Sequence, residues 1–136
     1  MDEVNSKSGM TLDEMKAFIR NQTEELVNRR NLGILDVNLA PDFVDHGADV
    51  PPGTPPGKEG IKQYVGNAFR RFPDFHSHIE DVVAEDDRVA VRYRWTGTHA
   101  RTGDRIEFCG IMIWRIASRK IVERWAYLEP MRTLSS

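Results

Sequence analysis

The stretch "IVERWAYLEP" at positions 121–130 carries acidic and aromatic residues that could do acid-base chemistry at the mouth of a barrel. Two sets alternate along it: Glu123, Trp125, Tyr127 and Glu129 in one, and Arg124, Ala126 and Leu128 in the other. Because successive side chains of a strand point to opposite faces, only one set lines any given cavity. The inward set therefore decides whether the cavity holds a carboxylic acid.

Other residues could bind a metal or act as a nucleophile. His76, His78 and Glu80 share one face of a predicted strand, but a zinc site needs further ligands and supporting partners. We expect a solvated strand face and predict no metal and no cofactor. Cys109 lies in a strand-like run without a motif that places a base beside it, so we expect a buried, inert thiol.

Arginines and aromatic residues alternate in the segment "RYRW", where Arg92 and Arg94 are separated by Tyr93. A buried arginine is costly unless it is paired with an acid. The default expectation is an ion pair across the outer face of the sheet, to an acid such as Glu107 or Glu123. The sequence leaves open which of the two alternating sets faces inward.

Helices are expected in the first half of the chain. Thr11 and Glu14 form a capping box, and an apolar stripe at helical spacing follows to about Arg30. A further helix begins near Lys58 and ends at Pro73. The segment "PPGTPPG" between these helices is predicted to be a surface loop.

The second half changes to a repeat of two residues, which is typical of strands. Four strands are predicted, in the segments "FHSHIEDVVA", "RVAVRYRWTGTHA", "IEFCGIMIWRI" and "KIVERWAYL". Helices followed by an antiparallel meander indicate the α+β class, with the helices packed on one face of a curved sheet.

Composition limits the classes of function. With 136 residues and a net charge of -2, the chain is expected to form one domain and lacks the basic excess of nucleic-acid-binding proteins. A mean hydropathy of -0.51 and the lack of a long apolar run argue against a membrane protein. The polar N-terminus and the single cysteine predict a cytoplasmic location.

The sequence resembles the SnoaL-like polyketide cyclases, also called ester cyclases, of the nuclear-transport-factor-like (cystatin-like) group. The resemblance extends from about Met10 to Leu128. Its matching segments are "LAPDFVDHG", "PPGKEGIKQYV", "RFPDF", "IEDVVAEDDRVAVRYRWTGTH" and "GIMIWRIASRKIVERW".

This resemblance implies a conical α+β barrel of about four to six strands wrapped around N-terminal helices. We expect residues 1–9 to be a poorly ordered tail and residues 10–136 to form the single domain. The open end of the cone is expected to bind a flat, apolar small molecule, and two copies are expected to pair through the sheet, with Trp125 and Tyr127 as candidate contacts. The expected pocket residues are Phe43, Tyr64, Phe69, Phe72, Gly110, Met112, Trp114 and Ala126.

The resemblance also bears on catalysis, because the cyclases of this family use an aspartate that follows a tryptophan on the last strand. Here Trp125 is followed by Ala126, and a position that is often polar on the preceding strand is Met112. Neither side chain exchanges a proton. On this assignment the set with Arg124 and Ala126 faces inward, and the set with Glu123 faces outward.

Two functions remain open at this stage. One is an aldol cyclase-type enzyme acting on an aromatic or cyclic ligand, with His46 as the substitute acid or base. The other is a ligand-binding or accessory protein without chemistry. A one-residue shift in register would reverse every face and bring Glu123 or Glu129 back as a catalytic acid.

Overall fold

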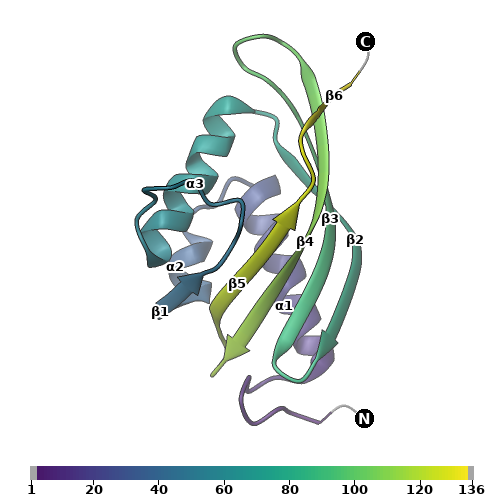
Figure 1. Cartoon of the computed structure of the whole chain (residues 1–136). Helices are drawn as coiled ribbons and strands as arrows, with labels where there is room; N and C mark the ends of the chain where they lie inside the picture. The colour runs from purple at the N-terminus through teal and green to yellow at the C-terminus, as the bar shows by residue number, and fades with distance from the viewer. Residues whose placement is uncertain (1–2, 135–136) are drawn as a thin grey trace.

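The computed structural model describes residues 3–134, in which helices pack on the concave face of a curved sheet (Figure 1). The helical elements are α1 (Leu12–Thr23), η1 (Glu24–Asn28), α2 (Ile34–Asn38) and α3 (Gly57–Arg71). The strands are β1 (Leu39–Asp45), β2 (His76–Glu85), β3 (Arg88–Thr98), β4 (Arg105–Ala117), β5 (Lys120–Leu128) and β6 (Arg132–Thr133).

The first helix begins at the predicted capping box. Thr11 Oγ1 accepts from the backbone N–H of Glu14 at 3.0 Å, and the Glu14 carboxylate accepts from the backbone N–H of Thr11 at 2.9 Å. After Thr23 the helix widens into the π-helical turn η1, in which the N–H of Arg29 donates to the carbonyl of Glu24 at 3.0 Å. Such turns change the direction in which the following side chains point.

The sheet has the strand order β1-β5-β4-β3-β2, and β6 pairs with β4. The predicted antiparallel meander from β2 to β5 is confirmed, while β1 adds a parallel strand beside β5. The sheet is curved but does not close (Figure 1). The α+β prediction is therefore confirmed, with an open cone in place of a closed barrel.

The register of β3 settles the question left open by the sequence. Tyr93 and Trp95 are buried on the concave face, while Arg92 and Arg94 lie on the other face. There Arg94 pairs with Glu80 and Glu107 on the neighbouring strands, and Arg92 pairs with Asp81. The expected ion pair across the outer face is thus present.

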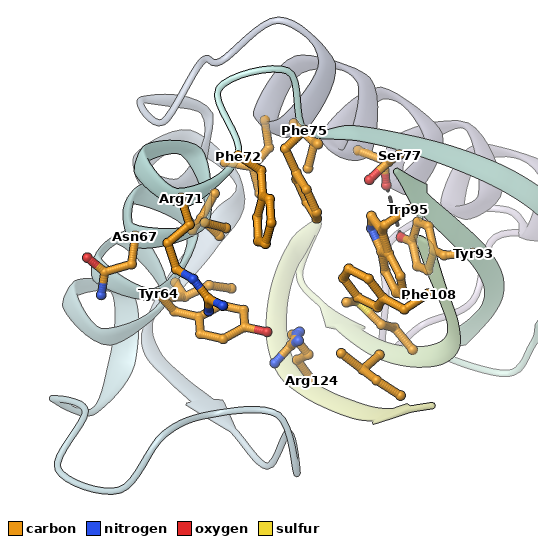
Figure 2. Close-up of a pocket in the computed structure, with 18 of the residues that line it drawn as sticks. Tyr64, Asn67, Arg71, Phe72, Phe75, Ser77, Tyr93, Trp95, Phe108 and Arg124 are labelled. Atoms are coloured by element: carbon orange, nitrogen blue, oxygen red, sulfur yellow. Dashed lines mark hydrogen bonds between the residues drawn. The ribbon is translucent and has the colours of Figure 1, made fainter. Parts of the chain in front are cut away.

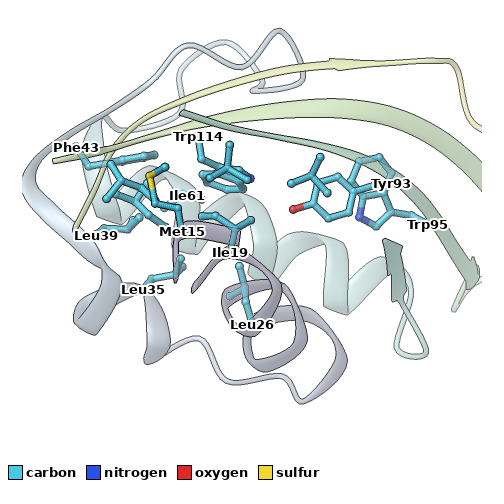
Figure 3. Packing of buried hydrophobic residues seen from close by; sticks show 14 of the residues in the cluster. Met15, Ile19, Leu26, Leu35, Leu39, Phe43, Ile61, Tyr93, Trp95 and Trp114 are labelled. Carbon is cyan, nitrogen blue, oxygen red and sulfur yellow. The ribbon is translucent and has the colours of Figure 1, made fainter. Parts of the chain in front are cut away.

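The hydrophobic core lies between the helices and the concave face of the sheet (Figure 3). Met15 and Ile19 of α1 and Leu35 of α2 are completely buried. They pack with Trp114 of β4 and other sheet residues in one cluster. This layer holds the helices at a fixed distance from the sheet and so defines the space beside them.

The first described residues are packed against the sheet. Ser8 is fully buried, and the Lys7 ammonium pairs with Asp86 at the β2–β3 turn. This packing differs from the poorly ordered tail expected for residues 1–9, of which residues 1–2 lie outside the described part. The boundary of the domain at residue 10 stays a prediction. Within residues 3–134, no helix combines the length and the apolar composition needed to cross a bilayer.

Removing the helix cap tests the first step of this fold. We expect Thr11→Ala to lower the free energy of unfolding by about 1 kcal/mol, because the N–H of Glu14 loses its acceptor. Thr11→Ser keeps the hydroxyl and should stay close to the wild type. Urea denaturation measures both variants, and an alanine variant as stable as the serine variant would contradict the assigned cap.

Candidate functional site

A cavity of about 420 Å³ lies between α1, η1, α3 and the concave face of the sheet (Figure 2). This volume lies within the range of about 300–1,000 Å³ that is typical of small-molecule sites. Its lining comprises Gln22, Thr23, Leu26, Val27, Pro51, Ile61, Tyr64, Val65, Asn67, Ala68, Arg70, Arg71, Phe72, Phe75, Ser77, Tyr93, Trp95, Phe108, Met112, Trp114, Arg124, Leu128 and Met131.

A continuous row of aromatic rings forms one wall of the cavity. Trp95 stacks between Tyr93 and Phe108, with ring centroids 4.9 Å apart in both pairs. Phe75 continues the row at 6.0 Å from Phe108, and Phe72 lies 6.2 Å beyond Phe75. The alternation of β3 and β4 places Tyr93, Trp95 and Phe108 on one face, and Phe72 and Phe75, between α3 and β2, complete the row. A wall of this kind favours a flat ligand that can stack on it.

The opposite part of the lining contains a buried charge. The guanidinium of Arg124 is only 2% exposed, and it donates to Asp45 Oδ1 at 2.7 Å and to Asp49 Oδ2 at 2.6 Å. Burial by itself lowers the pKa of Arg124, but the charges and hydrogen bonds of Asp49 and Asp45 outweigh it and raise the pKa. Arg124 therefore stays charged while it lines the cavity.

Tyr64 connects this charge cluster to α3. Its hydroxyl donates to Asp49 Oδ2 at 2.8 Å, and its ring lies 6.0 Å from the Arg124 guanidinium. Burial and the negative charge of Asp49 raise the pKa of Tyr64 well above its usual range. Asp49 Oδ1 is buried without a hydrogen-bond partner among the described residues. Asp49 thus keeps one carboxylate oxygen free to accept a hydrogen bond, next to a phenol that lines the cavity.

The structure places four of the predicted pocket residues in the lining: Tyr64, Phe72, Met112 and Trp114. Phe69 is not part of it, and the Arg30 guanidinium covers its ring at 4.6 Å. Phe43 contributes instead to a smaller cavity between β1 and the loop before α3.

Two further predicted residues face inward without reaching the cavity. Ala126 is completely buried opposite Met112, and its methyl group is too short to line the space. The space beside Gly110 is filled by Leu128, whose Cδ2 would lie 2.4 Å from a Cβ at that position. Gly110 therefore lets Leu128 enter the lining in its place.

His46 lies outside the cavity, on the outer face of β5. Its Nε2 is 2.7 Å from Glu123 Oε2, and its ring stacks on Trp125 at 5.1 Å. Hydrogen bonds from Arg115 and His46 hold the pKa of Glu123 below its usual range. The inward set on β5 is therefore the one with Arg124, and the substitute acid expected at His46 is on the wrong side of the sheet to reach a ligand in this cavity.

The two carboxylates that pair with Arg124 are not anticipated from the sequence. Asp45 and Asp49 flank the "HGA" segment that leads into the proline-rich loop, and neither was assigned a role. A signal existed, because Arg124 is the one charged residue in the otherwise apolar inward set of its strand. A buried arginine requires carboxylates, and both aspartates lie just before the predicted loop.

The metal alternative has no support in the described residues, where no group of three metal-binding side chains comes together. His76 and His78 lie close, with ring centroids 4.6 Å apart. Glu80, the third member of the predicted face, pairs with Arg94. Burial and nearby acids raise the pKa of the Cys109 thiol, which disfavours the reactive thiolate.

Comparison with known proteins identifies the family of this chain. A family model described as SnoaL-like polyketide cyclase matches residues 17–135. The chain belongs to the SnoaL-like polyketide cyclase family. The resemblance seen in its sequence motifs is thereby confirmed, and the open cone is the fold of this family's solved members. Among curated proteins, none matches the sequence of this chain.

Solved structures of SnoaL-like proteins superpose on most of the chain. IdmH, a proposed polyketide cyclase from Streptomyces antibioticus, has a TM-score of 0.73 at 30% identity over 83% of this chain and 90% of IdmH. A proposed polyketide cyclase from Bacillus cereus ATCC 10987 has a TM-score of 0.75 at 28% identity over 85% of this chain and 74% of that protein. AclR from Streptomyces galilaeus, a proposed hydroxylase, shares the fold with a TM-score of 0.75 at 24% identity over 88% and 91% of the two chains.

The buried charge cluster should dominate the stability of this region. We expect Arg124→Met to lower the free energy of unfolding by about 3–5 kcal/mol, because it leaves two carboxylates buried without a cation. The triple variant Asp45→Asn/Asp49→Asn/Arg124→Met removes those charges and should recover much of the loss. Thermal and urea denaturation compare the variants, and an Arg124→Met protein as stable as the wild type would contradict the cluster.

Proposed function

We propose that this protein binds a flat aromatic or cyclic ketone in the cavity and catalyses an aldol-type ring closure on it. The observation that carries the proposal is the hydrogen-bonded cluster of Tyr64, Asp49 and Arg124 at the cavity. The aromatic wall would stack on the ligand rings. The cluster would supply the proton transfer that Ala126 is unable to perform.

The reaction needs a base, an oxyanion partner and an acid. In the proposed first step the phenolic oxygen of Tyr64 takes a proton from the carbon next to the ligand carbonyl, while the Tyr64 hydroxyl proton moves to Asp49. Tyr64 is neutral before and after this step, which agrees with its raised pKa. The enolate oxygen is stabilised by N–H groups of Arg124 that its two aspartates leave free.

The second step forms the carbon–carbon bond. The enolate carbon attacks a second carbonyl of the same molecule, and the resulting alkoxide takes back the proton from Asp49 through Tyr64. The proton removed in the first step is thus returned, and no oxidant or other reactant is required. The ring closes because the cavity holds both carbonyls of one molecule together.

A non-catalytic ligand-binding protein is the second candidate. It is favoured by Ala126, which stands where the family's cyclases carry their aspartate. The contacts of Asp49 with Arg124 and Tyr64 also favour it. They stabilise the buried Asp49 carboxylate, and a cluster with a purely structural role would contain the same contacts. The two candidates differ in whether proton exchange occurs on a bound ketone.

Proton exchange can be measured without knowing the natural substrate. In D₂O, the wild type should accelerate loss of the α-proton NMR signal of 2-tetralone, and Tyr64→Phe should slow this exchange about 100-fold or more, while binding of 2-tetralone changes little. His46→Ala is the matched control and should exchange like the wild type, because His46 lies on the outer face. Binding of the ketone without any exchange in the wild type would support the second candidate.

We further propose that two copies pair through the outer face of the sheet. Tyr127 is 67% exposed and lies beside Ile111, which is 48% exposed, on the neighbouring strand. Trp125 is a weaker candidate for this contact than Tyr127, because His46 and Arg88 cover the Trp125 ring. Arg92 and Arg94 of this face are paired with acids, which limits the repulsion that a second copy would meet there. The cytoplasmic location stays a prediction.

A charged substitution on the outer face of the sheet tests the proposed dimer. We expect Tyr127→Glu to convert a dimer into a monomer in sedimentation equilibrium, because the carboxylate would be buried against its symmetry copy. Val37→Glu is the control, since Val37 is also exposed (59%) but lies on α2, away from the sheet face. A wild type that sediments as a monomer would refute the pairing outright.

A further inference from the structure

The charges around the cavity are unevenly distributed. Three arginines, Arg70, Arg71 and Arg124, belong to its lining, whereas no aspartate or glutamate among residues 3–134 does. The whole chain, in contrast, has a net charge of -2. The positive charge is therefore a local property of the cavity.

The three arginines differ in how far their charges are compensated. Arg124 is neutralised by Asp45 and Asp49. Arg70 and Arg71 have no ion pair with any residue in the described part of the chain, although Arg70 donates to the side chain of Asn67. Their charges thus remain available to a ligand.

The position of Arg71 fits a role in binding. It is exposed at the last turn of α3, and its guanidinium lies 5.2 Å from the centroid of the Phe72 ring. In Figure 2 its side chain leaves α3 on the side of the cavity, whose lining it joins. Phe72 is itself part of the aromatic wall, so a ring stacked on this wall would bring its substituents close to the guanidinium.

We propose that the ligand is a free carboxylic acid rather than its ester or another neutral ketone, and that Arg71, assisted by Arg70, binds its carboxylate at the rim of the cavity. This inference rests on the proposed function, because it specifies the ligand of the same cavity. The planar guanidinium can donate two parallel N–H groups to a carboxylate. An ester is uncharged, so it forms no ion pair with the guanidinium. Arg71 thereby determines specificity without taking part in proton transfer.

The positions of the arginines and the aromatic wall also predict how the ligand is oriented in the cavity. The carboxylate lies at the exposed rim with Arg70 and Arg71, and the rings lie against the buried side chains of Tyr93 and Trp95. A charged group at the rim keeps part of its hydration, so its desolvation cost is small. The apolar rings supply most of the binding free energy and the carboxylate selects among ligands.

A matched pair of probes tests the inference. Anthraquinone-2-carboxylate and its methyl ester share their rings and differ in the charge, and both can be titrated by fluorescence quenching of the cavity tryptophans at low ionic strength. We expect the wild type to bind the acid about 5- to 10-fold more tightly than the ester. Added salt should weaken binding of the acid and leave the ester unchanged.

Two arginine variants test whether Arg71 causes the difference in affinity between the acid and the ester. Arg71→Gln should remove most of the preference for the acid while affinity for the ester changes less than about 2-fold. Arg101→Gln is the control, because Arg101 is also an exposed arginine without an ion pair among the described residues, but it lies outside the lining. Since both changes are at exposed positions, both variants should fold.

The outcomes separate this inference from the proposed function. Equal affinity of the wild type for acid and ester would overturn the inference and leave the proposed function standing. An equal loss of both affinities in Arg71→Gln would also overturn it, since Arg71 would then act only by packing on Phe72. Failure of both probes to bind would count against the proposed cavity ligand itself.

Discussion

The burial of one guanidinium charge organises the functional half of this molecule. Arg124 projects from β5 into an apolar layer, where a charge without partners would be very costly. Asp45 at the end of β1 and Asp49 in the following loop supply those partners. The backbone of the same segment is fastened to β5, since the N–H of His46 donates to the carbonyl of Arg124 at 2.7 Å. The loop is thus held against the sheet from inside the fold, and Pro51 within it becomes part of the cavity lining.

This interaction also underlies the proton chemistry that we propose, because Asp49 contacts both Arg124 and Tyr64. At position 126 the chain has a methyl group, packed where it does not reach the cavity. In the proposed reaction the carboxylate is that of Asp49, on a loop distant in sequence, and Tyr64, which lines the cavity, connects it to the ligand. The aromatic wall is built from β3, β4 and the segment between α3 and β2, and it contains none of the residues of the Arg124 cluster.

Features governed by local rules could be predicted from the sequence, and features governed by distant contacts could not. The Thr11 capping box and the alternation along β5 follow from spacing alone, and both agree with the structure. The role of Asp49 depends on how a proline-rich loop folds back onto a strand 75 residues later. His46 is the expected substitute acid or base because it lies in the family-like segment "LAPDFVDHG", but the direction of its side chain depends on the distant contact with Glu123.

The central claim is that Asp49, rather than any residue of the outer face, is the acid and base of this cavity. The most direct measurement compares α-proton exchange of 2-tetralone in Asp49→Asn and Asp45→Asn. Both variants remove one carboxylate from Arg124, but only Asp49 accepts from Tyr64. The account predicts that Asp49→Asn loses the exchange by about 100-fold or more while Asp45→Asn keeps most of it. Equal rates in the two variants would contradict it.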